Sequence, residues 1–178
     1  MSMAASRLRS ERTRRIVLMG VSGSGKTTVG TALGEWIGAV YLDGDNLHPA
    51  ENIAKMSRGE ALGDADRWPW LTTVGRALDD PSSAVIVGCS ALKRAYRDHI
   101  RQVASGEVVF VHLMGSRELI GQRIAARSGH FMPVSLLDNQ FATLEPPGDD
   151  ERAITVDISQ PINAIVAQIV AGLLEEER

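Results

Sequence analysis

The hydrophobic and polar positions of this chain fall into two kinds of block. Short, unbroken apolar runs rich in β-branched residues, such as 84–88, are typical of strands buried on both faces of a parallel sheet. Longer blocks carry apolar residues three and four positions apart, as at Val29, Leu33 and Ile37, which is the spacing of helices. The pattern predicts strands over 16–19, 40–42, 84–88, 108–113 and 153–156. It predicts helices over 26–37, 50–59, 70–78, 92–103, 116–127, 133–144 and 162–174.

The order of these blocks predicts the fold class. Strands alternate with helices, which indicates an α/β domain whose five-stranded parallel sheet is covered on both faces, a three-layer α/β/α arrangement. The polar, glycine-containing segment 59–69 is expected to be an irregular surface excursion. Ligands of such sheets bind outside the carboxyl ends of the strands. Three groups follow strand ends and should converge on one cleft: residues 20–28, Asp43-Gly44-Asp45 and residues 89–93.

The loop after the first strand carries a phosphate-binding pattern. Gly20 is followed by four residues and then by Gly25-Lys26-Thr27, which is G-x-x-x-x-G-K-[ST] between a strand and a helix. Glycines let successive N–H groups point at phosphate oxygens, and the next helix presents its positive N-terminal end. Lys26 can reach the β- and γ-phosphates of ATP, and the Thr27 hydroxyl can ligate Mg²⁺. The expected nucleotide-binding residues of the loop are Gly20, Val21, Ser22, Gly23, Ser24, Gly25, Lys26, Thr27 and Thr28.

Two carboxylates follow the second predicted strand. Asp43 and Asp45 are separated by one residue, so both can face the cleft. Phosphoryl transfer to a hydroxyl needs Mg²⁺ and a carboxylate that orients the hydroxyl and accepts its proton. We assign Asp43 to the metal, together with Thr27, and Asp45 to the acceptor hydroxyl. A polar turn is the alternative, because Asp-Gly is common turn chemistry, but the phosphate loop favours the functional interpretation.

Two arginines on one helix predict a lid. Arg123 and Arg127 lie four residues apart, hence on one face, and an anion between them would offset their mutual repulsion. With the loop that follows, they predict a mobile lid over about 123–135 that closes on a triphosphate and excludes water. A solvated basic face paired with acids such as Glu118 is the alternative.

Other basic residues lie nearer the predicted cleft or on the surface. Lys93 stands at a strand-to-helix junction near the cleft, whereas Arg97 and Arg101 are expected on the surface. Arg67 could hold an acidic substrate or pair with Asp64 or Asp66, and the sequence leaves both open. The histidines show no metal-ligand spacing, so no structural zinc site is expected.

Composition narrows the class of protein. The 178 residues suit one domain over 16–178, preceded by a basic leader over 1–15. The net charge of −3 gives no reason to expect nucleic acid or an anionic membrane as partner, and no apolar run is long enough to span a bilayer. A single cysteine, Cys89, excludes an internal disulfide and is expected to be a packing residue. The leader has no apolar stretch, so we expect a cytoplasmic protein.

Taken together, these motifs resemble those of the gluconate kinases. The likeness lies in Gly20-Val21-Ser22-Gly23-Ser24-Gly25-Lys26, in Leu42-Asp43-Gly44-Asp45 with His48-Pro49 and Asn52, and in Asp66-Arg67 with Pro69-Trp70. It continues in Cys89-Ser90-Ala91-Leu92-Lys93 with Tyr96-Arg97, in Gly129-His130-Phe131 and in Gln140-Phe141. Members of that family often have Lys before the lid glycine and a second aromatic residue after Phe131, where this chain has Ser128 and Met132.

The resemblance implies a P-loop kinase with a nucleoside-monophosphate-kinase-like fold, usually a homodimer. It implies transfer of phosphate from ATP to the terminal hydroxyl of D-gluconate, with Lys26, Asp45 and Arg127 as catalytic residues. It also implies that Arg123 and Arg127 contact the nucleotide and that Gln160-Pro161 borders its base. The implied substrate-binding residues are Asp45, His48, Asn52, Arg67, Lys93 and His130.

Adenylylsulfate kinase is the nearest alternative, because its phosphate loop and Asp43-Gly44-Asp45-Asn46 are similar. That family normally continues with an arginine-bearing segment, where this chain has Leu47-His48-Pro49. Shikimate kinase is a more distant relative by fold. A non-catalytic nucleotide switch would carry an Asn-Lys-x-Asp motif for guanine, and the sequence contains none.

Overall fold

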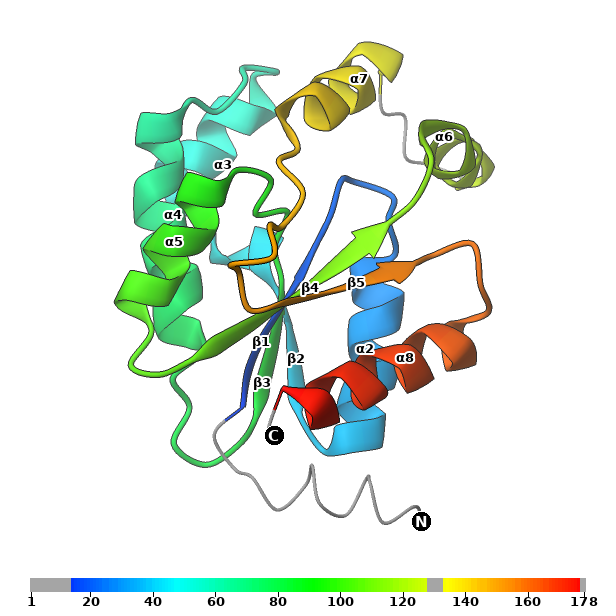
Figure 1. Ribbon diagram of the computed structural model, residues 1–178. Helices are drawn as coiled ribbons and strands as arrows, with labels where there is room; N and C mark the ends of the chain where they lie inside the picture. The colour runs from blue at the N-terminus through cyan, green and yellow to red at the C-terminus, as the bar shows by residue number, and fades with distance from the viewer. Residues whose placement is uncertain (1–13, 128–132, 177–178) are drawn as a thin grey trace.

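The computed structural model describes residues 14–127 and 133–176. Five parallel strands form one sheet in the order β2-β3-β1-β4-β5 (Figure 1). The strands are β1 (Arg15–Met19), β2 (Val40–Asp43), β3 (Val85–Gly88), β4 (Val108–Met114) and β5 (Ala153–Asp157). The predicted α/β fold with a five-stranded parallel sheet is confirmed, and each strand lies within one residue of its apolar run.

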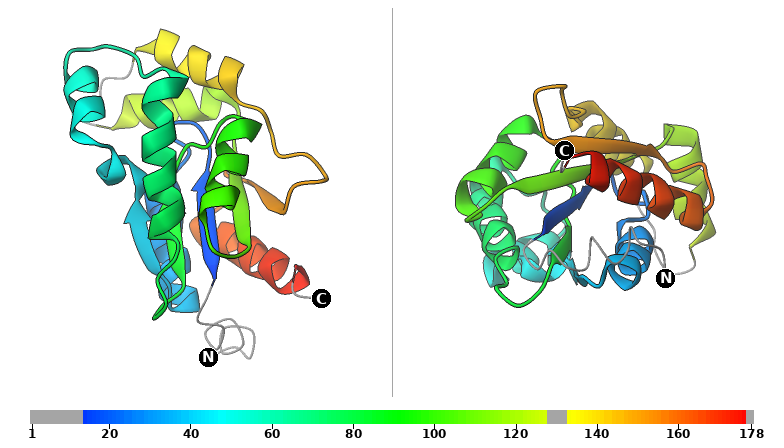
Figure 2. Two further views of the ribbon diagram at one scale, coloured as in Figure 1. Left: turned by 90° about the vertical axis from the view of Figure 1, so that its left-hand side faces the viewer. Right: turned by 60° about the horizontal axis from the view of Figure 1, so that its bottom comes forward.

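Helices cover both faces of this sheet. They are α2 (Lys26–Ile37), η1 (Gly44–Leu47, a 3₁₀ turn), α3 (Ala50–Ser57), α4 (Asp64–Ala77), α5 (Arg94–Val103), α6 (Arg117–Ala126), α7 (Val134–Thr143) and α8 (Ile162–Glu175). In Figure 2, α2 and α8 lie on one side of the sheet and α4 and α5 on the other. Ile16 and Leu18 of β1 belong to the core under α2 and α8, whereas Val17 and Met19 belong to the core under α4 and α5. Successive strand side chains point to opposite faces, so one unbroken apolar run supplies both cores.

The prediction for residues 59–69 is wrong in its second half, because α4 begins at Asp64 rather than Trp70. The Asp66 carboxylate accepts the Gly63 N–H at 2.8 Å, which satisfies an amide at the start of the helix. Pro69 lies inside α4, where it removes one backbone hydrogen bond. The helix forms nonetheless, because it buries Trp70, Leu71 and Val74 against the sheet.

The first strand begins one residue earlier than its apolar run. We expected the leader to extend to this residue, but Arg15 is the first residue of β1, and its guanidinium pairs with Asp79 at 2.6 Å. Residues 1–13 lie outside the described part of the chain.

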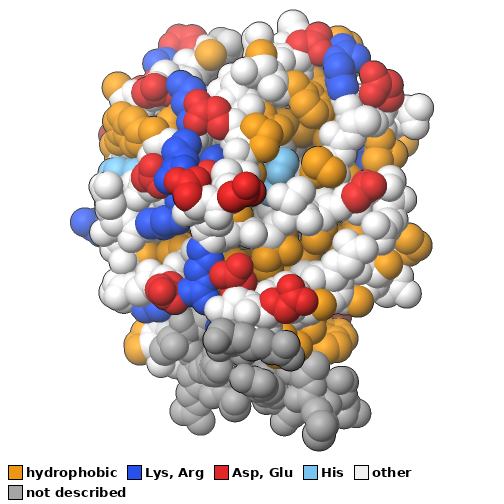
Figure 3. Space-filling model, in the orientation of Figure 1, with side chains coloured by type: hydrophobic (Ala, Val, Ile, Leu, Met, Phe, Trp, Pro, Cys, Tyr) orange, Lys and Arg blue, Asp and Glu red, His pale blue; other side chains and the backbone are white. Residues whose placement is uncertain are grey.

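Three of the helices lie at the end of the molecule to which the strands' carboxyl ends point. In Figure 1, α3, α6 and α7 lie at the top, beyond the ends of β1 and β4. On the face that carries α5, basic and acidic side chains alternate in a band (Figure 3). Ion pairs there include Arg94 with Asp150 and Arg101 with Asp98. Within the described residues, no helix has both the length and the apolar character needed to cross a bilayer.

Candidate active site

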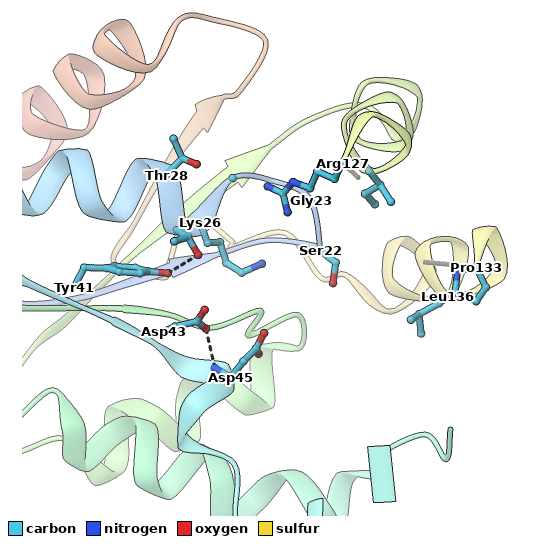
Figure 4. Close-up of a pocket in the computed structure, with 13 residues that line it drawn as sticks. Ser22, Gly23, Lys26, Thr28, Tyr41, Asp43, Asp45, Arg127, Pro133 and Leu136 are labelled. Atoms are coloured by element: carbon cyan, nitrogen blue, oxygen red, sulfur yellow. Dashed lines mark hydrogen bonds between the residues drawn. The ribbon is translucent and has the colours of Figure 1, made fainter. Parts of the chain in front are cut away.

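One cavity of about 640 Å³ opens where the phosphate loop, the end of β2, α6 and α7 meet (Figure 4). Two of the three groups expected to converge on one cleft meet here, residues 20–28 and 43–45, whereas none of residues 89–93 lines the cavity. Its lining residues are Ser22, Gly23, Gly25, Lys26, Thr27, Thr28, Tyr41, Asp43, Asp45, Ile124, Arg127, Pro133 and Leu136.

The loop over residues 20–25 depends on glycine for its shape. Gly20, Gly23 and Gly25 have φ values of 148°, 81° and 93°, in the region that side chains disfavour. A Cβ at Gly20 would lie 2.9 Å from the Ser24 hydroxyl oxygen, and one at Gly23 would lie 2.7 Å from Ile124. The loop is also bonded to the segment that follows β3, because the Gly20 N–H donates to the Ser90 carbonyl at 3.2 Å.

Lys26 folds back on the loop that precedes it. Its ammonium donates to the carbonyls of Gly20 at 3.0 Å and Val21 at 3.2 Å. Burial lowers the pKa of Lys26, and the charges of Asp45 and Asp43 oppose that shift. The Lys26 ammonium therefore lies between the loop carbonyls and the two carboxylates, where anionic phosphate oxygens would find a cation.

The backbone holds both carboxylates in place. Asp43 caps η1, because its Oδ1 accepts the Asp45 N–H at 3.0 Å. The buried Trp70 indole N–H donates to the Gly44 carbonyl at 2.8 Å, and a Cβ at Gly44 would lie 2.3 Å from the Gly88 carbonyl. These contacts fix the turn against β3, so Asp45 projects into the cavity from an anchored backbone.

Oxygen donors suited to Mg²⁺ share this cavity. The exposed Thr27 hydroxyl lines it together with Asp43 and Asp45. Mg²⁺ prefers such hard oxygen ligands, and beside phosphates it takes one or two protein carboxylates and keeps several waters. Among the described residues, no cluster of three or more His, Cys, Asp or Glu side chains forms a fuller cage. The residues fit a metal that is held mainly by nucleotide and water.

His48 and Asn52 lie beside the cavity and do not line it. The His48 ring stacks on Trp70 at a centroid distance of 4.2 Å. The buried Asn52 amide donates to the Asp66 carbonyl at 2.8 Å and lies 3.3 Å from His48 Nδ1. Burial lowers the pKa of His48, so the ring is neutral at pH 7 and can act as donor or acceptor.

Lys93 and Arg67 form the basic side of the same region. Lys93 pairs with Asp64 at 3.2 Å, and the Tyr96 hydroxyl donates to that carboxylate at 2.5 Å. Asp66 pairs with Lys55 at 2.7 Å rather than with Arg67. The Arg67 guanidinium lies 5.8 Å from the Tyr96 ring centre, and it contributes to the lowered pKa of His48. Neither of these two cations lines the cavity.

Only one of the two arginines of the predicted lid lines the cavity. Arg127 ends α6 and lines the cavity, whereas the Arg123 guanidinium donates to the Ile158 carbonyl at 2.6 Å. Gln160 bonds to Gln168 at 2.7 Å and Pro161 precedes α8, both outside the cavity lining. His130 and the rest of 128–132 lie outside the described residues.

Arg97 does not lie on the surface where the sequence predicts it. It is fully buried, not on the surface, and pairs with the buried Glu151 at 2.7 Å. Its Nη1 also donates to the Ala91 carbonyl at 3.0 Å and the Leu92 carbonyl at 3.3 Å. Arg97 thus holds the segment that leads to Lys93. The signal was in the sequence, because Arg97 lies three residues before Ile100, on the apolar face of the predicted helix.

Gln140 and Tyr41 form polar contacts with Ser22 and Thr27, and we did not predict either as a site residue. The Gln140 side-chain oxygen accepts the Ser22 N–H at 2.7 Å, and its amide donates to the Ser22 hydroxyl at 3.0 Å. The Tyr41 hydroxyl donates to Thr27 Oγ1 at 3.3 Å.

Cys89 is buried, which raises its pKa to about 12 and keeps it a thiol.

Residues 16–147 match the family described as "AAA domain". The chain is 44% identical over 162 residues to the thermoresistant gluconokinase of Escherichia coli (strain K12), covering 86% of this chain and 90% of that one. A gluconokinase crystal structure from Sinorhizobium meliloti 1021 has a TM-score of 0.83 at 50% identity, covering 92% and 93% of the two chains. The APS kinase of Mycobacterium tuberculosis, solved with AMPPNP and APS, shares only the fold, with a TM-score of 0.65 at 19% identity over 91% and 98% of the chains. The two gluconokinases are each more than 40% identical to this chain over most of its length. The chain therefore belongs to the gluconokinase family of P-loop kinases.

Proposed function

We propose that this chain transfers the γ-phosphoryl group of Mg-ATP to the terminal hydroxyl of D-gluconate, giving 6-phospho-D-gluconate and ADP. The observation that carries the proposal is the meeting of Lys26, Thr27 and Asp45 in one cavity, since direct transfer needs phosphate, metal and acceptor groups together. The identity to the E. coli gluconokinase supports gluconate as the acceptor.

In the proposed step, the substrate oxygen attacks the γ-phosphorus as the bond from phosphorus to the bridging oxygen breaks. Asp45 orients the hydroxyl and accepts its proton, and the electrons of the broken bond remain on ADP. Lys26 moves from the loop carbonyls to the β- and γ-oxygens, and Arg127 approaches the same charge from the end of α6. These side chains and the loop N–H groups stabilise the charge of the transition state.

Thr27 and Asp43 are the residues we assign to Mg²⁺. When bound, the ion supplies positive charge at the β- and γ-phosphates. Asp43 already accepts the Asp45 N–H through Oδ1, so its second oxygen is the one that we assign to the metal or to a metal-bound water.

A sugar acid suits the region beside the cavity. We assign its carboxylate to Arg67 and Lys93, whose charges lie on that side, and its hydroxyls to the neutral His48 and to Asn52. His130 is a further proposed contact. We assign Arg123 to the nucleotide and Gln160-Pro161 to the edge of its base, with the lid over about 123–135 closing on both.

The proposal is tested by ADP release with Mg-ATP and a panel of acceptors: gluconate, other sugar acids, shikimate, adenylylsulfate and none. Turnover with gluconate well above the others is the expected result. Turnover with adenylylsulfate and not with gluconate would move the function to the alternative kinase. No turnover with any acceptor, with nucleotide binding intact, would overturn a kinase function for these substrates.

We also infer a cytoplasmic homodimer. The family resemblance supports the dimer, and the single buried cysteine is consistent with a reducing compartment. Light scattering of the purified protein would contradict the dimer if the mass equalled one chain at micromolar concentration.

A further inference from the structure

Tyr41 occupies a slot that two glycines create. It lies two residues before Asp43 on β2, so the two side chains leave the strand on the same side. A Cβ at Gly30 of α2 would lie 2.3 Å from the Tyr41 ring, and a Cβ at Gly88 of β3 would lie 2.3 Å from its hydroxyl oxygen. Any larger residue at either position would displace the ring. The fold therefore fixes where the Tyr41 hydroxyl lies.

The Tyr41 hydroxyl lies in the cavity beside Thr27, the residue that we assign to Mg²⁺. It donates to Thr27 Oγ1 at 3.3 Å, as the dashed line in Figure 4 shows. A tyrosine phenol carries a proton at neutral pH and can donate it, and a threonine hydroxyl can accept it.

A threonine hydroxyl has two acceptor positions and one proton, and it rotates to suit its partners. When Tyr41 donates to one acceptor position of Thr27 Oγ1, the other remains for a cation in the cavity that Thr27 lines. The same bond restricts rotation of the hydroxyl, so less freedom is lost when a cation binds.

We propose that Tyr41 is a positioning residue that orients the Thr27 hydroxyl toward the divalent cation of the bound nucleotide. The inference rests on the proposed function, because it takes Thr27 as a ligand of Mg²⁺. A phenylalanine would fill the same slot without the bond, so the role belongs to the hydroxyl and not to the packing of the ring.

The test measures nucleotide binding rather than turnover. Calorimetry gives the affinity of the full-length protein for ATP with Mg²⁺ and with EDTA, and the ratio is the gain due to the metal. Tyr41→Phe should reduce this gain about three- to tenfold, the value of one hydrogen bond, and leave the affinity in EDTA unchanged. Tyr96→Phe is the matched control, because it removes the chain's other tyrosine hydroxyl, which bonds to Asp64.

A double-mutant cycle separates this role from a structural one. In a Thr27→Ala background, Tyr41→Phe should have no further effect on the metal-dependent gain. Three outcomes would each overturn the proposal. The first is an equal metal-dependent gain in wild type and Tyr41→Phe, and the second is an effect of Tyr41→Phe that persists in the Thr27→Ala background. The third is an ATP affinity of the wild type that is the same with and without Mg²⁺. Because the readout contains no acceptor, a failure to phosphorylate gluconate would contradict the proposed function and leave this result standing.

Discussion

At the scale of single residues, the polar side chains of the cavity are positioned mainly by the backbone. Lys26 bonds to two loop carbonyls, Asp43 to an amide, and the turn that carries Asp45 is held by the Trp70 indole. A substitution at the tip of such a side chain therefore changes the chemistry while the backbone that positions it keeps its contacts.

Asp45 offers the sharpest residue-scale prediction. Asp45→Asn keeps the size of the side chain and removes its capacity to accept a proton, so we expect kcat with gluconate to fall about 10²- to 10⁴-fold. The KM for ATP should change by less than about threefold, because the loop contacts remain. Steady-state kinetics at saturating gluconate measures both. Near-normal kcat in the variant would remove Asp45 as the base.

At the scale of elements, local patterns predicted the strands and most helices, but not the contacts between distant segments. The periodicity of α2 and the glycine motif of residues 20–25 are local, so both could be predicted from the sequence. The polar, glycine-containing segment 59–69 was predicted to be irregular, but α4 begins at Asp64. The apolar surface that Trp70 and Leu71 bury stabilises this longer helix, and a local pattern does not include that contact. Arg97 was misplaced although it lies on the apolar face of its helix, because the partner that allows its charge to be buried, Glu151, lies 54 residues away.

Of the candidate site, the sequence indicated Asp43, Asp45, Arg127 and the phosphate loop, which line the cavity except for Gly20, Val21 and Ser24 of the loop. The separation of Arg123 from Arg127 was not predictable from helical spacing, because it depends on the Ile158 carbonyl of another segment. Tyr41 was missed because its role depends on glycines at positions 30 and 88, which only the fold brings together.

The bond between α7 and the phosphate loop gives an element-scale prediction. Gln140→Leu removes both hydrogen bonds to Ser22 while keeping a side chain of comparable bulk. Two bonds of ordinary strength predict a rise in the KM for Mg-ATP of about fivefold or more, because the loop loses its support from α7.

Asn139→Leu is the control, since Asn139 is the exposed neighbour of Gln140 on α7. Kinetics and thermal unfolding of both variants are compared. If Gln140→Leu lowered Tm and left the KM for ATP at the wild-type value, the contact would serve folding and not nucleotide binding.

At the scale of the whole molecule, a buried ionic network joins the segment before Lys93 to the start of β5. Glu151, just before β5, accepts from Arg97 and Arg101 of α5 and from the Gly148 N–H. Through Arg97 the network reaches the carbonyls of Ala91 and Leu92 beside Lys93. The bond between the Glu145 N–H and the Leu92 carbonyl, at 2.8 Å, closes the same region from the segment after α7. The network therefore connects stability of the fold to placement of the 89–93 segment.

This network predicts how stability depends on pH. The bonds from Arg97 hold the pKa of Glu151 at about 2, against an ordinary value of 4.5. A carboxylate whose pKa is lower in the folded state stabilises the fold above the unfolded value and loses that contribution as pH falls through the folded one. Glu151 should thus contribute fully above about pH 5 and progressively less toward pH 2.

Glu151→Gln leaves the Arg97 charge buried without its partner, so we expect a loss of about 3–5 kcal/mol in the free energy of unfolding at pH 7. Glu60→Gln makes the same chemical change in an exposed pair with Arg58, where the expected loss is at most about 1 kcal/mol. Denaturant titrations at pH 7, 5 and 3 should show the gap between wild type and Glu151→Gln narrowing as pH falls, while Glu60→Gln follows the wild-type curve. A gap of constant size across that range would mean that Glu151 supports the fold through its shape and neutral hydrogen bonds, and that its charge has no part in the acid sensitivity of this protein.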